Sequence, residues 1–195
     1  MHMSTRSIRR KLLSTVAVGG VLAAALSAVV FSAFSSTTTV RDNRFEAGSI
    51  KLSDSSQGSA LFNASGLEPG DVQTRCLKVS YSSTGSLTSK VRLYGATTGA
   101  GLDKYLHLTI ARGSFSGAQP SGNDCTGFVP DSAAILYDGP MSAFPTAYDS
   151  GKADPDDAWA DGESAVYKVT VALDDDDRAQ GLDATQELTW EARTS

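Results

Sequence analysis

Histidine is scarce in this 195-residue chain, which contains only His2 and His107. No pair of imidazoles at helical spacing is available to hold a catalytic zinc ion, so the zinc-protease motif is absent. No serine lies in a Gly-x-Ser-x-Gly elbow, and no nucleophile with a neighbouring base stands out. His107 falls on the polar face of a predicted strand and is interpreted as a surface histidine. The sequence therefore predicts no catalytic residue, no metal site, no cofactor and no enzyme activity.

A basic stripe interleaved with aromatic residues is also missing. Residues 1–33 contain four basic and no acidic residues, so the remainder holds 13 basic and 22 acidic residues, a net charge of −9. A surface of that sign repels phosphate backbones, which disfavours nucleic acid as a partner. The hydrophobic fraction of 41% and the charged fraction of 20% are near the globular average. The length predicts one folded domain with appendages.

The N-terminal segment has the pattern of a secretory signal peptide at residues 1–33. A basic stretch from Arg6 to Lys11 precedes 23 residues, 12–34, that carry no charge. Ser32 and Ala33 are the small residues of the expected cleavage region, with Phe34 directly after them. A membrane anchor is the alternative, because about 20 apolar residues suffice to span a bilayer. With cleavage, the chain is secreted and meets the membrane only transiently.

Cysteine is as scarce as histidine, with Cys76 and Cys125 as the only two. Both lie in the part predicted to be exported, and no third cysteine competes for either of them. An oxidising exterior lets the pair close, so we expect a Cys76–Cys125 disulfide. Two unpaired buried thiols are the alternative.

Apolar residues alternate with polar ones over most of the chain from residue 47 onward, which is the period of half-buried strands. Leu77, Val79 and Tyr81 give one such apolar face. Turn residues separate about seven or eight of these runs, which predicts two antiparallel sheets packed as an all-β sandwich over residues 47–195. Residues 113–162 lack the alternation. We interpret them as an irregular insertion on one edge, held by Cys125, with a short helix near 141–148.

Two acidic runs raise the question of calcium binding. One is the four aspartates at 174–177, and the other comprises Asp154, Asp156 and Asp157. Four consecutive aspartates point in divergent directions, and the alternating ligands and glycine of a calcium loop are missing. A solvated turn is therefore favoured, although the sequence leaves calcium binding open.

Several segments in a fixed order carry a resemblance to a known family. They are AFSS at 33–36 after the export signal, FEAGSIKLS at 45–53, LEPGD at 67–71, SL at 86–87 before VRL at 91–93, and LTWEA at 188–192. Together they resemble the TasA/camelysin family, and the added cysteine pair resembles an actinobacterial-type branch. The resemblance implies a jelly-roll sandwich, secretion through a dedicated signal peptidase, and assembly by donor-strand complementation into biofilm-matrix fibres or pili. Some members carry a metalloprotease label, which the missing metal ligands here put in doubt.

The segment between the signal and the sandwich, 34–46, is the predicted donor extension. Its residues 34–40 form a β-prone stretch with no obvious partner in their own chain, and Phe34, Ser36, Thr38 and Val40 share one face by parity. A disordered leader, or pairing within its own sandwich, is the alternative. The expected function is a secreted fibre subunit whose partners are copies of itself and related matrix subunits. A monomeric cell-surface adhesion or binding module is the alternative, followed by a camelysin-like metalloprotease.

Overall fold

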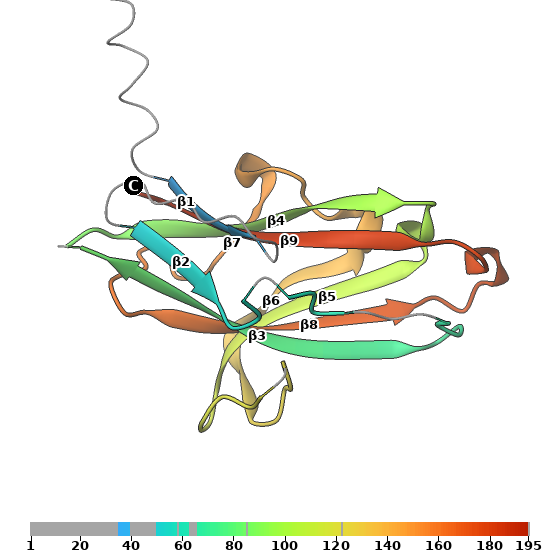
Figure 1. Ribbon diagram of the computed structural model, residues 1–195, viewed down its shortest axis with the longest axis horizontal. Helices are drawn as coiled ribbons and strands as arrows, with labels where there is room; N and C mark the ends of the chain where they lie inside the picture. The colour runs from blue at the N-terminus through green and yellow to red at the C-terminus, as the bar shows by residue number, and fades with distance from the viewer. Residues whose placement is uncertain are drawn as a thin grey trace, which may run out of the picture. The chain divides into compact units, whose positions relative to one another are not determined.

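The computed structural model describes residues 35–39, 50–57, 59–62, 66–84, 86–121 and 123–194. These residues form two antiparallel sheets that face each other (Figure 1). One sheet has the strand order β1-β9-β4-β7 and the other β2-β3-β8-β5-β6. The strands are β1 (Ser35–Thr39), β2 (Ile50–Asp54), β3 (Val72–Ser83), β4 (Ser89–Gly99), β5 (Leu106–Phe115), β6 (Phe128–Pro140), β7 (Lys152–Ala153), β8 (Ser164–Leu173) and β9 (Ala184–Thr194).

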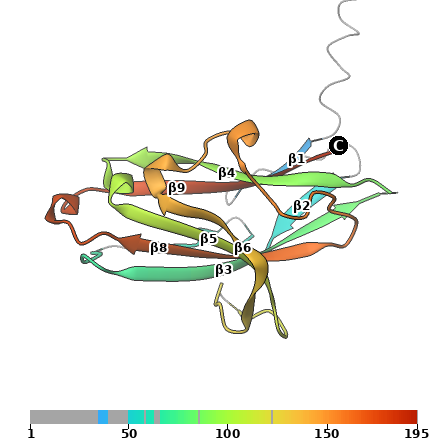
Figure 2. The same ribbon diagram turned by 180° about the vertical axis from the view of Figure 1, so that it is seen from behind.

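The predicted all-β sandwich is confirmed. The alternating residues Leu77, Val79 and Tyr81 of β3 are buried, and they face the other sheet, whose β9 contributes the fully buried Trp190. The Trp190 ring packs against Tyr167 of β8, with 5.2 Å between the ring centroids. The reverse view shows the same two layers, with β4 and β9 over β5, β8 and β3 (Figure 2). Burial of one face from each sheet supplies the main driving force for this arrangement.

Residues 113–162 are more regular than the sequence predicts. Residues 113–115 complete β5, and β6 adds a long edge strand over residues 128–140. The pairing of β5 with β6 shifts register twice, near Ile110 and Ala111, and most of β6 is exposed. An edge strand with bulges has no continuous buried face, so its sequence shows no clean alternation. The interpretation of this region as an irregular insertion is therefore corrected: it lies at one edge, as expected, but contains the long strand β6.

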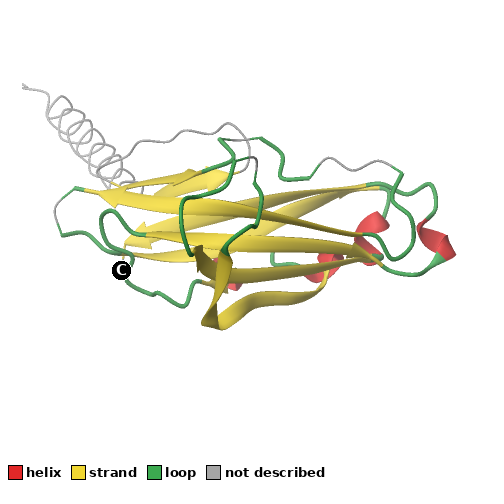
Figure 3. Ribbon diagram, turned by 90° about the horizontal axis from the view of Figure 1, so that it is seen from below, coloured by secondary structure: helices red, strands yellow, loops and turns green. Residues whose placement is uncertain are grey.

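Helical structure among the described residues is limited to four short turns, seen as the red segments in Figure 3. The helix expected near 141–148 is replaced by two separate 3₁₀ turns, η2 (Met141–Ala143) and η3 (Tyr148–Ser150). The other two are η1 (Leu102–Lys104) and η4 (Asp177–Ala179). Phe144 and Pro145 lie between η2 and η3, and both Phe144 and Met141 contribute to the core. Extended backbone at Phe144, with ψ near 137°, ends the first turn.

Candidate functional site

An apolar groove lies between the two sheets where β9 begins and β8 ends. Its volume is about 840 Å³, and it is called the end groove below. Its apolar lining comes from both sheets and from the segments before β3, and it includes Leu61, Leu67, Leu108, Val171, Leu173 and Leu188. Because one sheet contributes Leu188 and the other Leu108 and Val171, the groove is a part of the sandwich interior that is accessible from outside.

One edge of the end groove is formed by the beginning of β9. β1 pairs with β9 only from Thr189 to Arg193, and no strand among the described residues pairs with 184–188 on that side. Gly95 lies opposite Leu188 but donates its N–H to Pro145 on the far side of β4. The antiparallel bonding pattern alternates, so the backbone groups of residues 184, 186 and 188 point toward the open edge. This edge offers main-chain donors and acceptors to an added strand.

The corresponding edge of β3 is covered in stages. β2 pairs with residues 79–83, and the Ser55 N–H then donates to the Lys78 carbonyl at 2.9 Å. Next along the edge, the Cys76 N–H donates to the Asn123 carbonyl at 2.8 Å. Beyond it, the guanidinium of Arg75 donates to the Thr74 carbonyl at 2.8 Å. The two strand edges beside the groove therefore differ, and the β9 edge is the more available for pairing.

Acidic side chains surround the end groove. Asp71, Asp176, Asp183 and Glu187 belong to its lining. Hydrogen bonds from the side chain and backbone of Arg178 lower the pKa of Asp176 to about 2, so this carboxylate is ionised at neutral pH. The aspartates at 174–177 form the solvated turn that the sequence predicts, except that Asp176 is only partly exposed and caps η4.

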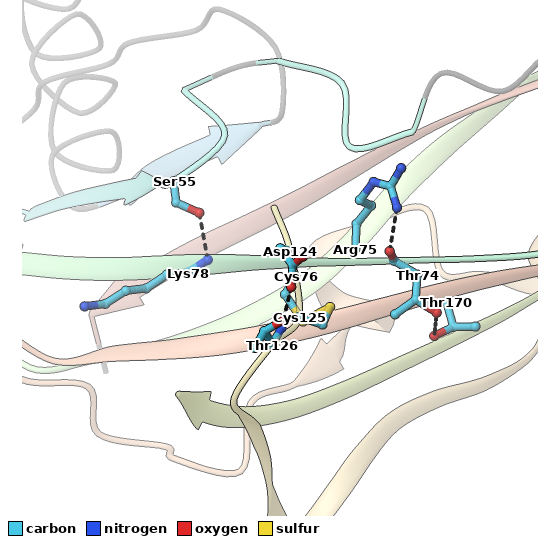
Figure 4. The surroundings of a disulfide bond; sticks show 9 residues. All are labelled: Ser55, Thr74, Arg75, Cys76, Lys78, Asp124, Cys125, Thr126 and Thr170. Carbon is cyan, nitrogen blue, oxygen red and sulfur yellow. Dashed lines mark hydrogen bonds between the residues drawn. A yellow bond between two sulfur atoms is a disulfide. The ribbon is translucent and has the colours of Figure 1, made fainter. Parts of the chain in front are cut away.

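The predicted disulfide between Cys76 and Cys125 is confirmed, with the two Cα atoms 5.1 Å apart. Cys76 lies on the outer face of β3, as its parity predicts, yet only 1% of it is exposed. The connection between β5 and β6 brings Cys125 onto that face and covers Cys76 (Figure 4). The outer position of Cys76 follows from the alternation along β3, whereas its burial depends on a loop contact distant in sequence.

The predicted donor segment has a partner in its own chain, which corrects the expectation that it has none. β1 pairs antiparallel with β9, and this places Ser36 opposite Ala192 and Thr38 opposite Trp190. Phe34 and Val40 lie outside the described residues, as do Ser32 and Ala33 of the expected cleavage region. Residues 1–33, expected to be a signal peptide, and most of the 34–46 extension likewise lie outside the described residues.

A buried polar cluster around Asp154 was missed by the sequence interpretation, which placed this residue in a solvated run. Its side chain is 2% exposed. It accepts hydrogen bonds from Arg112 Nε at 2.9 Å, Trp159 Nε1 at 3.0 Å and Tyr167 Oη at 2.6 Å. Burial, together with the charge of Asp154, raises the pKa of Tyr167 well above its ordinary value.

Arg112 completes the Asp154 cluster with a second ion pair to Asp131. Burial alone lowers the pKa of Arg112, but the charge of Asp154 and the bond to Asp131 more than offset that effect, so the pKa is raised. The Asp154 carboxylate thus accepts a hydrogen bond from each of the three side-chain donors, on Arg112, Trp159 and Tyr167. No sequence signal distinguished Asp154 from its neighbours Asp156 and Asp157, because its burial depends on β5 and β8. The cluster holds the segment after β7 in place rather than leaving a reactive group accessible.

His107 is a surface residue, as predicted, and its Nε2 lies 2.7 Å from Asp138 Oδ1 on β6. Within the described ranges, no group of three or more His, Cys, Asp or Glu side chains is arranged to hold a metal ion. The described part of the chain also contains no helix of the length and hydrophobicity needed to cross a membrane.

Comparisons with known proteins do not assign the chain to a family. No family model matches its sequence, and no curated protein matches it either. Inference about function therefore depends on the end groove, the edge of β9 and the disulfide-bonded loop.

Proposed function

We propose that the chain is a secreted structural subunit that assembles into an extracellular fibre or pilus by donor-strand exchange. The observation that carries this proposal is the outer edge of β9 beside the end groove, where β1 pairs with residues 189–193 and no described strand pairs with 184–188 on the side away from β4. An extended strand that adds to a sheet edge gains main-chain hydrogen bonds, and its alternate side chains enter the pockets below. An available strand edge and a groove beside it occur together here.

The position of β1 supports exchange between copies. β1 is the first strand of the described body, is five residues long and lies at the edge of its sheet. Ten residues, 40–49, connect it to β2. A terminal edge strand on such a connection can pair with residues 189–193 of β9 in a neighbouring copy through the same bonds that it makes in its own chain, and the edge at 184–188 leaves room for a longer added strand. A head-to-tail exchange generates filaments when the rotation from one copy to the next does not close into a ring.

The remaining features agree with a structural role. The resemblance to the TasA/camelysin family points to secreted matrix fibres, and a disulfide is compatible with an oxidising extracellular environment. The net charge of −9 after residue 33 favours solubility before assembly. The polar cluster at Asp154 has a structural function, so it does not favour an enzyme.

A pair of proline substitutions in β1 tests the proposal. Thr38 lies opposite Trp190, whose backbone groups point toward β1, so the Thr38 N–H is used in pairing. The Thr37 N–H points away from β9. Thr38→Pro removes a bond from the exchanged strand and is expected to abolish fibres seen by electron microscopy, whereas Thr37→Pro retains them.

Deletion of residues 34–40 is the second test. The truncated protein is expected to stay folded, with an unfolding transition, and to remain monomeric. Fibres of normal length from the truncated protein or from Thr38→Pro would refute donor-strand exchange. A wild-type protein that stays monomeric at all concentrations would instead favour the adhesion or binding module.

A further inference from the structure

The loop between β5 and β6 crosses the outer face of its sheet to reach β3. We call residues 116–121 and 123–127 the strap. It connects β5 and β6, which lie two and three strands away from β3 in the order β3-β8-β5-β6. The Cys76–Cys125 disulfide and the hydrogen bond from the Cys76 N–H to the Asn123 carbonyl fasten it there, beside an electrostatic attraction between Asp124 and Arg75. Figure 4 shows Cys125 beside Cys76 on the outer side of the sheet.

The strap occupies main-chain groups that an added strand would otherwise use. The N–H of Cys76 points away from β8, toward the edge that β2 leaves uncovered. Asn123 supplies the acceptor from a left-handed backbone conformation with φ of 61°, which asparagine tolerates better than most residues. Native proteins commonly cover exposed strand edges in this way, because an open edge is a template for another chain.

The two sulfur atoms differ in accessibility and surroundings. Cys76 is 1% exposed, whereas Cys125 is partly exposed on the strap. Lys168 of β8 lies directly opposite Cys76 on the outer face. Its ammonium group lies 5.2 Å from the ring centroid of Phe128, at the base of the strap. A positive charge on the residue that pairs with a cysteine across the sheet favours the thiolate form, which makes that sulfur the better leaving group.

We propose that Cys125 is a thiol-exchange site whose reaction with an external dithiol releases the strap and uncovers the edge of β3. The thiolate of the dithiol attacks Cys125 Sγ, forms a mixed disulfide and expels the Cys76 thiolate. The second thiolate of the dithiol then attacks the mixed disulfide and expels Cys125. The dithiol is oxidised to a disulfide, both cysteines are reduced, and two electrons and two protons pass to the protein.

Release of the strap makes a main-chain donor at the edge of β3 available. Without the disulfide, a single hydrogen bond to Asn123 remains between the strap and Cys76, and its net contribution is small in water. The Cys76 N–H then becomes available to solvent or to a strand from a second copy. The site is therefore a redox control of strand pairing on the sheet opposite β9, independent of whether β1 is exchanged.

Trapping and hydrogen exchange test the proposal on the oxidised, folded protein. After brief exposure to glutathione and alkylation, mass spectrometry should find the mixed disulfide on Cys125 and the alkyl group on Cys76. After full reduction by a dithiol, amide exchange at Cys76 should accelerate at least tenfold. The amide of Tyr81, which donates to the Glu163 carbonyl at 2.9 Å, is the internal control and should stay protected.

Two variants distinguish the proposed thiol exchange from a general loss of stability of the fold. Lys168→Gln should slow the reaction with glutathione by at most about fivefold, the upper limit for losing one unit charge at contact distance in water. Lys104→Gln, in η1 on another part of the molecule, should leave the rate unchanged. Glutathione attached to Cys76, a Cys76 amide that stays protected after reduction, or equal rates for both variants would overturn the proposal.

Discussion

Replacement of Asp154 by alanine is the perturbation that the structure predicts to be most damaging among the acidic residues. The carboxylate is 2% exposed and accepts bonds from Arg112, Trp159 and Tyr167. Its removal leaves the Trp159 N–H and the Tyr167 hydroxyl without an acceptor. Arg112 then keeps only its ion pair with Asp131. Breaking a buried ion pair from one side costs about 3–5 kcal/mol. We expect Asp154→Ala to lower the free energy of unfolding by about 4 kcal/mol, because the separate losses are not additive.

Denaturant unfolding followed by tryptophan fluorescence measures this loss directly. Trp159 and Trp190 are the two tryptophans of the chain, and the indole N–H of Trp159 bonds to Asp154. Asp157→Ala is the matched control, because Asp157 is exposed on the same segment and its loss should change stability by less than about 0.5 kcal/mol. Asp154→Asn keeps the shape of the side chain, so its loss of unfolding free energy should lie between those of Asp154→Ala and Asp157→Ala. Equal unfolding midpoints for Asp154→Ala and Asp157→Ala would refute the assignment of Asp154 as the centre of the cluster.

Three further outcomes are expected. The double substitution of Cys76 and Cys125 by alanine should cost about 4 kcal/mol of unfolding free energy, as expected for a disulfide between residues 49 apart, and an unchanged urea midpoint would contradict this. A Cβ on Gly95 would lie 1.8 Å from the Glu187 carbonyl oxygen, whereas one on Gly117 meets no atom within 4 Å. Gly95→Ala should therefore lower the melting temperature clearly, and Gly117→Ala should leave it nearly unchanged. The pKa of Asp176 is lowered to about 2 from an ordinary 3.8, so its ionised form stabilises the fold above pH 4, and this contribution disappears as the pH falls toward 2. Asp176→Asn should lose that acid dependence in thermal unfolding at stepped pH.

The parts of the fold that can be predicted from the sequence depend on simple patterns, namely alternation along a strand and the presence of only two cysteines. In β3, Leu77, Val79 and Tyr81 alternate with polar residues, and each is buried because the opposite sheet covers that face. The disulfide was predictable because two cysteines without competitors have only one way to pair. Surface placement of His107 follows from the same parity argument, since its neighbours Leu106 and Leu108 face the core.

The missed features depend on residues far apart in the chain. β1 pairs with β9 at a sequence separation of about 150 residues, and its Ser and Thr side chains carry no alternation that would reveal a partner. Asp154 is buried by Arg112 and Tyr167 from two other strands, so its own segment looks like any acidic turn. The end groove arises because β1 and β2 each cover only part of their neighbouring strands, which is a property of register and not of composition.

The place of β9 in its sheet determines when that sheet can form. β9 is the last of the described strands in sequence, yet it lies between β1 and β4 and contributes Trp190 to the core. The strands β2, β3, β8, β5 and β6 can pair before residue 184 is available, whereas β1 and β4 have no central strand until the C-terminal residues arrive. Synthesis that stops near residue 183 would leave the apolar face of the five-stranded sheet open to water. Folding of the complete sandwich therefore requires synthesis of residues 184–194, and products truncated before them should aggregate or be degraded rather than accumulate as partial subunits.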